Sequence, residues 1–163
     1  MNSLFLVAGT IALLGSALVG GVFFAFSSFV MKALARVPSS EGIAAMQSIN
    51  VVVINPSFLG VFMGTALLSL AVVGLALTKW SHPAAMFFLA GAIFYFVGTF
   101  IVTVAGNVPL NDQLAAVSAT DAAAAELWEH YLGRWTMWNH VRTVSAMVGA
   151  LLFTLGLMQN GAA

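Results

Sequence analysis

The sequence has few charged residues and no cysteine. Five Lys and Arg and five Asp and Glu make up 6% of its 163 residues, whereas a soluble domain carries about 25% charged residues. A soluble protein with so little charge would expose large apolar patches, so the composition indicates a protein whose solvent is lipid. The formal net charge of zero excludes a basic, nucleic-acid-binding surface. The lack of cysteine excludes disulfides, thiolate catalysis and cysteine metal sites.

Charged side chains are missing from residues 1–31, 42–78 and 83–111, and from the chain after Arg142. A helix crosses the hydrocarbon core with about 20 mainly apolar residues. The pattern therefore predicts an all-α, integral membrane four-helix bundle that forms one transmembrane domain over residues 1–163. The expected spans are approximately 4–32, 51–78, 84–106 and 135–158, and a helix over 121–134 extends the fourth span. A short interfacial helix is expected between the first and second spans, from Ser39 to Asn50.

The first apolar run, from Leu4 to Met31, lacks a basic leader and exceeds the roughly 7–15-residue core of a signal peptide, so we expect a retained span. Four basic residues fall on one side of the expected membrane and one on the other: Lys32, Arg36, Arg134 and Arg142 against Lys79. This bias favours both termini outside the cell. We expect a multi-pass protein of a bacterial-type plasma membrane, with the lipid bilayer as its main partner.

Small residues recur at helical spacing in two spans. Four of them follow one another every fourth residue in the first span: Ala8, Ala12, Ser16 and Gly20. In the second span, Gly60 and Gly64 form a GxxxG pair. Both patterns are typical of close helix contacts in lipid, and the glycine pair also makes a homo-oligomer an expected form of the protein.

The segment from Trp128 to Arg142 holds three of the four tryptophans. On a helix that turns about 100° per residue, it separates into two faces. One face is aromatic and ends in an amide and a guanidinium: Trp128, Tyr131, Trp135, Trp138, Asn139 and Arg142. The other face carries solvated groups: Glu126, Glu129, His130, Arg134 and His140. We therefore interpret the first face as the candidate site. His130 and His140 lack the spacing of four that indicates a helical metal site, so no metal ligand is predicted.

Polar residues in the third span point to the same end of the bundle. Tyr95, Thr99, Thr103 and Asn107 follow one another at spacing four and lead into the segment Asn107–Asp112, which has the composition of a turn. At the start of the second span, Asn55 precedes Pro56 and is either a helix cap or a polar group that faces the bundle.

In an antiparallel bundle these segments meet at one end. The residues expected to converge there are Asn55, Asn107, Asn111, Asp112, Trp135, Trp138, Asn139 and Arg142. An arginine inside a membrane is by default evidence of a functional site. The alternative is that the Arg142 side chain extends to the membrane surface.

Several runs of the sequence are similar to one family. N-V-P-L-N at 107–111 precedes the pattern W-x-x-Y-x-x-x-W-x-x-W-N-x-x-R from Trp128 to Arg142. The segment G-G-V-F-F-A-F-S-S-F-V in the first span and I-N-P at 54–56 belong to the same resemblance. Over nearly its whole length the chain resembles the DUF1772 family of small integral membrane proteins, which is described as anthrone oxygenase-like.

Some members of that family oxidise anthrones to anthraquinones, so the resemblance implies the oxidation of a hydrophobic aromatic small molecule without a cofactor. In such a reaction Arg142 and Asn139 would donate hydrogen bonds to the developing oxyanion, and Asp112, preferred to His140, would be the base. The expected substrate-binding residues are Trp135, Trp138, Tyr131, Asn107, Asn111 and Asn55.

Two other functions stay open from the sequence. A non-catalytic protein could hold a hydrophobic ligand or a lipid in the same site. An accessory subunit of a membrane complex could instead dock another membrane protein through Gly60 and Gly64.

Overall fold

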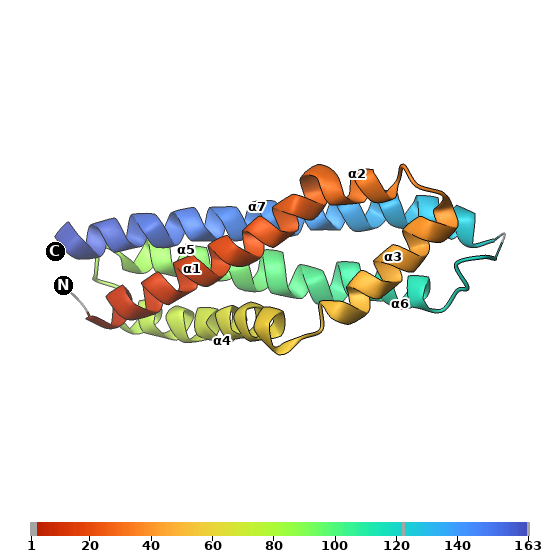
Figure 1. Cartoon of the computed structure of the whole chain (residues 1–163). Helices are drawn as coiled ribbons and strands as arrows, with labels where there is room; N and C mark the ends of the chain where they lie inside the picture. The colour runs from red at the N-terminus through yellow and green to blue at the C-terminus, as the bar shows by residue number, and fades with distance from the viewer. Residues whose placement is uncertain (1–2, 122, 163) are drawn as a thin grey trace.

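The computed structural model describes residues 3–121 and 123–162, the last three of them by their backbone only, and these residues form helices joined by short connections (Figure 1). Within this part of the chain, four helical rods are long and apolar enough to cross a membrane: Ser3–Leu34, Pro56–Thr78, Ala85–Ala115 and Ala124–Gln159. The predicted all-α fold with four spans is confirmed.

Two of the rods combine α-helical and π-helical segments. The first consists of α1 (Ser3–Ala25), η1 (Phe26–Val30) and α2 (Met31–Leu34), and the third of α5 (Ala85–Tyr95), η2 (Phe96–Ile101), η3 (Thr103–Asn107) and α6 (Val108–Ala115). The second rod is α4 (Pro56–Thr78) and the fourth is α7 (Ala124–Ala162). A separate helix, α3 (Ser39–Val52), joins the first rod to the second, as expected from the sequence.

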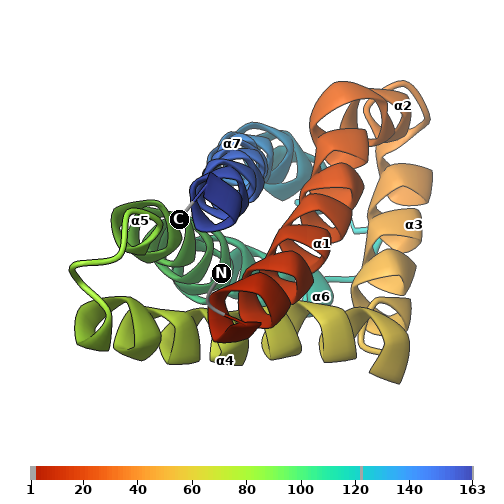
Figure 2. The same cartoon turned by 90° about the vertical axis from the view of Figure 1, so that its left-hand side faces the viewer.

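The rods lie side by side in a bundle whose two ends differ. α7 and the third rod run along the length of the molecule, α1 crosses them diagonally, and α4 lies obliquely beneath (Figures 1 and 2). One end is formed by α2, α3, α6 and the start of α7, and the two chain ends lie at the other (Figure 1). Ile43 and Met46 of α3 are fully buried in the cluster that contains Trp128 and Leu114, so α3 covers the first end.

The row of small residues in the first span packs α1 against α7, as predicted. Ala12 and Ser16 are fully buried, and the Ser16 hydroxyl donates a hydrogen bond of 3.1 Å to the Ala146 carbonyl oxygen. The second small-residue pattern behaves differently. A Cβ added to Gly60 or Gly64 would meet no atom within 4 Å, so the predicted helix contact of this pair does not occur among the residues that the structure describes.

The segment Asn107–Asp112, predicted to be a turn, is helical. η3 ends at Asn107, and α6 continues at once, with a proline in its first turn. The rod does not restart at this proline, because the N–H of Val108 donates to the Thr103 carbonyl oxygen five residues back. The second rod begins later than expected, at Pro56, because α3 ends at Val52 and Asn55, with an extended backbone (φ −128°, ψ 158°), is the N-cap of α4.

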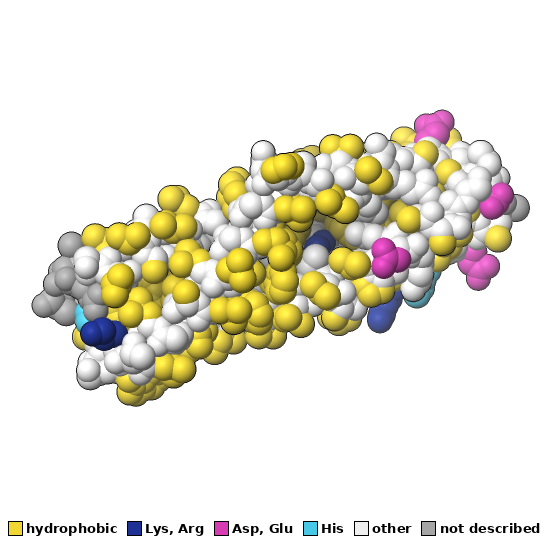
Figure 3. Space-filling view, turned by 90° about the horizontal axis from the view of Figure 1, so that it is seen from below, with side chains coloured by type: hydrophobic (Ala, Val, Ile, Leu, Met, Phe, Trp, Pro, Cys, Tyr) yellow, Lys and Arg dark blue, Asp and Glu magenta, His cyan; other side chains and the backbone are white. Residues whose placement is uncertain are grey.

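Charged side chains lie mainly at the ends of the molecule. Figure 3 shows acidic side chains at one end, an apolar surface over the middle, and one basic side chain recessed in a hollow at mid-length. All five acidic residues are exposed. Arg142 lies about halfway along α7 and is only 4% exposed, so the middle of the bundle contains a buried cation.

We predict that Gly98→Ala destabilises the bundle and that Gly74→Ala does not. A Cβ at Gly98 would overlap the Ser145 hydroxyl and lie 2.6 Å from the Ser145 Cβ, so rotation of the hydroxyl cannot relieve the overlap. Such overpacking costs about 1–3 kcal/mol. Gly74 faces open space, where removing a helical glycine adds up to about 1 kcal/mol. Thermal midpoints in one detergent measure the difference, and equal midpoints would contradict the close packing of η2 on α7.

Candidate functional site

The Trp128–Arg142 segment occupies the first half of α7, and its two faces separate as the helical periodicity predicts. The aromatic face is buried, with Trp128, Tyr131, Trp135, Asn139 and Arg142 each at most 5% exposed. The opposite face is exposed: Glu126, Glu129, His130, Arg134 and His140. The helix therefore turns its aromatic and amide groups, together with one cation, toward the other rods.

Arg142 is surrounded by neutral groups. Its Nη2 donates to Asn139 Oδ1 at 2.7 Å, and its Nη1 donates to the Thr103 hydroxyl at 3.3 Å. The guanidinium carbon lies 4.0 Å from the centre of the Phe23 ring and 5.0 Å from that of Trp135. Both distances are within the range of a cation–π contact. The two rings and two polar oxygens thus hold the cation in place.

The Arg142 Nε is buried and has no hydrogen-bond partner among the described residues. Because the acidic side chains are exposed and none of the described ones forms an ion pair with Arg142, its charge is not compensated within this part of the chain. A buried charge without a partner is strongly unfavourable. The site is therefore suited to a ligand with an anionic or strongly hydrogen-bond-accepting group, which would accept from the free Arg142 Nε and balance its charge.

Asn139 connects Arg142 to the first rod. Its Nδ2 donates to the Phe23 carbonyl oxygen and to the Ser27 hydroxyl, each at 2.7 Å, while its Oδ1 accepts from Arg142. The Ser27 hydroxyl in turn lies 3.0 Å from the hydroxyl of Thr143. Because both ends of the amide are engaged, Asn139 fixes the position of the guanidinium relative to α1 and η1.

A second group of hydrogen bonds holds the aromatic face. Asn111 Oδ1 accepts from the Tyr131 hydroxyl at 2.9 Å and from Trp135 Nε1 at 2.8 Å. Asn50 Nδ2 lies 3.4 Å from the Tyr131 hydroxyl, and Asn107 Nδ2 donates to the Trp135 carbonyl oxygen at 3.1 Å. Asn107 Oδ1 is buried without a partner among the described residues, so the site holds a free acceptor as well as a free donor.

Comparison with known families assigns the chain to one of them. Residues 57–152, more than half of the chain, match the model of a family described as anthrone oxygenase. The chain belongs to the anthrone oxygenase family. The resemblance seen in the sequence runs is thereby confirmed, and with four spanning-length helices the chain is an integral, multi-pass membrane protein. No match was found among curated proteins or solved structures.

The matched region of this anthrone oxygenase family member includes most of the predicted site residues, and the fold brings six of them together. Asn107, Asn111, Tyr131, Trp135, Asn139 and Arg142 form the linked groups described above. Three predicted residues lie apart from them. Trp138 is half-buried against Gly106, Asn55 caps α4 by accepting from the Phe58 N–H at 3.0 Å, and Asp112 is exposed on α6.

Sequence reasoning missed the partners that other rods supply. Phe23 and Ser27 come from the first rod, Asn50 from α3 and Thr103 from η3. The polar row of the third span contained Thr103, but no local pattern marks Phe23 among the other phenylalanines of the first span. Only the packing of α1 and η1 against α7 selects it.

The π-helical segments of the described chain all contact α7. Residues spaced by four drift by about 40° per step on an α-helix, which turns about 100° per residue. A π-helix has i to i+5 hydrogen bonds and turns less per residue, so η2 and η3 reduce that drift. Tyr95, Thr99 and Asn107 therefore all stay buried in the bundle, where Thr99 donates to the Arg142 carbonyl oxygen at 3.3 Å. π-Helical turns occur frequently at functional sites.

We predict that Asn139→Leu destabilises the protein more than Arg142→Met does. Asn139→Leu removes the acceptor of a buried cation, a loss of about 1–3 kcal/mol or more. Arg142→Met leaves the Asn139 acceptor unpaired but also removes the uncompensated buried charge, so its net cost should be smaller. The double variant Asn139→Leu/Arg142→Met should lose less unfolding free energy than Asn139→Leu alone. Thermal unfolding in detergent tests this, and a double variant less stable than Asn139→Leu would contradict the coupling.

Proposed function

We propose that this protein oxidises a flat aromatic ketone of the anthrone type with molecular oxygen, without a cofactor, and that Arg142 binds the enolate oxygen. The observation that carries the proposal is the buried guanidinium, which has no acidic partner in the described chain and a free Nε. Membership of the anthrone oxygenase family supports the reaction class.

The charge and the shape of the site suit such a substrate. An enolate oxygen is an anion, so it supplies the charge that Arg142 lacks, and its negative charge increases as the substrate ionises. Donors that strengthen with developing charge stabilise the reactive state, and this effect is larger where water is excluded. The rings of Phe23 and Trp135, whose centres lie 4.0 and 5.0 Å from the guanidinium carbon, provide apolar walls for a planar molecule.

The reaction balances with oxygen as the only oxidant. The carbon opposite the ketone loses one proton and becomes part of the enolate. The enolate transfers its electrons to oxygen, a carbon–oxygen bond forms, and protonation gives a hydroperoxide. Loss of the second proton from the same carbon then breaks the oxygen–oxygen bond and releases water. The CH₂ group becomes a carbonyl, and one molecule of oxygen yields the quinone oxygen and the water.

Among the described residues, the site contains no acidic or histidine side chain that could remove the proton from the substrate. Asp112 and His140, the bases considered from the sequence, are both exposed. We therefore assign Arg142 the main role: it favours the ionised ketone, whose proton passes to water. Asn139, whose amide nitrogen already donates to Phe23 and Ser27, holds the guanidinium in position. Tyr131, Asn107 and Asn111 position the Trp135 ring beside the guanidinium.

We predict that Arg142→Gln lowers the kcat/KM for anthrone oxidation by about 10²–10³-fold, the usual effect of removing one oxyanion donor. Oxygen uptake by purified protein in detergent, with unsubstituted anthrone, measures the rate above the spontaneous reaction. Arg134→Gln is the matched control, because it changes the same residue type on the exposed face of the same helix. It should leave the rate unchanged.

Two results would contradict the proposal. If Arg142→Gln retained the original kcat/KM, the oxyanion role would be wrong. If anthrone quenched the tryptophan fluorescence of the unaltered protein but no oxygen was consumed, the site would bind the ligand without catalysing its oxidation.

A further inference from the structure

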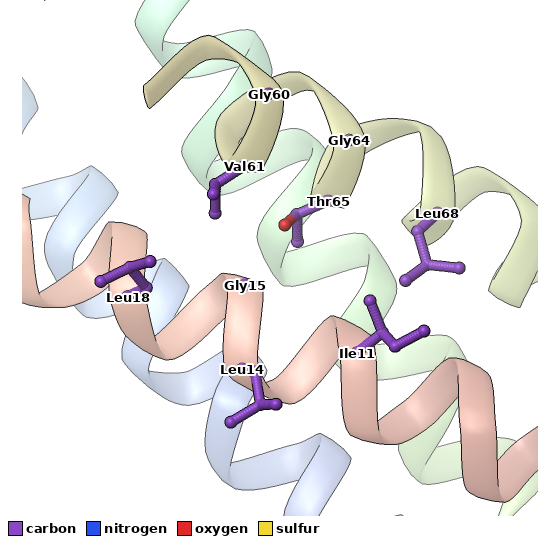
Figure 4. Close-up of a pocket in the computed structure, with 9 residues that line it drawn as sticks. All are labelled: Ile11, Leu14, Gly15, Leu18, Gly60, Val61, Gly64, Thr65 and Leu68. Carbon is purple, nitrogen blue, oxygen red and sulfur yellow. The ribbon is translucent and has the colours of Figure 1, made fainter. Parts of the chain in front are cut away.

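A groove opens between α1 and α4 (Figure 4). It has a volume of about 480 Å³ and is lined chiefly by Leu14, Gly15 and Leu18 of α1 and by Gly60, Gly64 and Thr65 of α4. Gly60 and Gly64 are exposed, and a Cβ added to either meets no atom within 4 Å. Because Gly60 and Gly64 have no side chains and meet no other helix of the described chain, they leave this groove open.

The groove continues toward the first turn of α4. A second cavity of about 200 Å³ shares Leu18 and Val61 with it and reaches Val22 and Phe58. Figure 4 shows Val61 and Thr65 directed from α4 toward α1, and Thr65 packs so closely on Gly15 that a Cβ there would overlap its hydroxyl. The two spaces thus follow the same pair of helices and end at Phe58.

Two aromatic rings separate the second cavity from Arg142. The half-buried Phe58 ring meets the Phe23 ring edge-on, with centroids 6.3 Å apart, and the Phe23 ring centre lies 4.0 Å from the Arg142 guanidinium carbon. Asn55 holds the backbone of this turn, because its side-chain oxygen accepts from the Phe58 N–H. The groove, Phe58, Phe23 and Arg142 therefore form one continuous series from the outer surface to the cation.

We propose that this groove is the lateral portal through which a flat, apolar ring system passes from the bilayer to Arg142, with Phe58 as its inner gate. The proposal rests on the function proposed above, because that function makes Arg142 the group to which the ligand binds. Its occupant is an aromatic molecule dissolved in the membrane, because the lining is apolar and the groove belongs to two spanning helices. The combined space is in the size range of small-molecule sites.

A helix from a second copy fits this geometry less well. A helix with its side chains is about 10 Å or more across, whereas the second cavity, which leads to Phe58, holds only about 200 Å³. A planar ring system can enter edge-on and stack on Phe58.

The test fills the groove without disturbing the packing of the chain. Gly64→Leu places a side chain in the open space, and Gly74→Leu is the matched control, because Gly74 lies on the same helix, also faces open space and does not line the groove. With anthrone as substrate, we expect Gly64→Leu to lower kcat/KM by at least about tenfold with little change in kcat. Gly74→Leu should match the unaltered protein.

A second measurement does not depend on catalysis. The probe is unsubstituted anthracene, which has no oxygen atom for Arg142 to bind. Energy transfer from tryptophan to anthracene should be saturable in three proteins: the unaltered protein, Arg142→Gln and Gly74→Leu. In Gly64→Leu this saturable signal should be lost. If the protein consumes no oxygen but this pattern holds, the proposed reaction fails while the portal stands.

Three results would overturn the portal. The first is saturable anthracene binding in Gly64→Leu equal to that of Gly74→Leu, and the second is an unchanged kcat/KM in Gly64→Leu. The third is a change of oligomeric state, measured by light scattering, in Gly64→Leu but not in Gly74→Leu, since this would identify the groove as an interface between copies.

Discussion

The burial of Arg142 without an acidic partner in the described chain is the constraint on which the site depends. A charged side chain inside the hydrocarbon region is costly and needs polar or aromatic groups that face it. Phe23, Asn139 and Thr103 provide that environment from three different rods. The free Nε then leaves one direction of the guanidinium available to a ligand. Stability and ligand binding therefore compete at the same side chain.

The π-helical turns allow the first and third rods to meet this requirement. η1 follows Phe23, whose carbonyl oxygen accepts from Asn139, and η3 carries Thr103 and Asn107 toward α7. A regular α-helix would rotate residues spaced by four progressively away from one side. The wider turns keep the polar row directed into the bundle over several turns, so the third rod stabilises both Arg142 and Trp135.

Small residues serve two different purposes in the two helices that border the groove. In α1, Ala12 and Ser16 are covered by other rods and allow α1 to approach α7. In α4, Gly60 and Gly64 are open and produce a space instead of a contact. Spacing alone cannot distinguish these outcomes, because it shows which residues share a helix face but not what that face meets.

The sequence by itself determined the four apolar helices, the two faces of α7 and six residues, Arg142 among them, that the fold links into the two groups around Arg142 and Trp135. It could do so because charge and helical periodicity are local properties. It failed where a residue's role depends on another rod or on a change of helical register. Phe23 looked like any other phenylalanine, Asn55 became a cap and Asp112 remained exposed. Only the tertiary structure decided these roles, since the diagonal course of α1 and the π-helical turns determine which side chains face the buried cation.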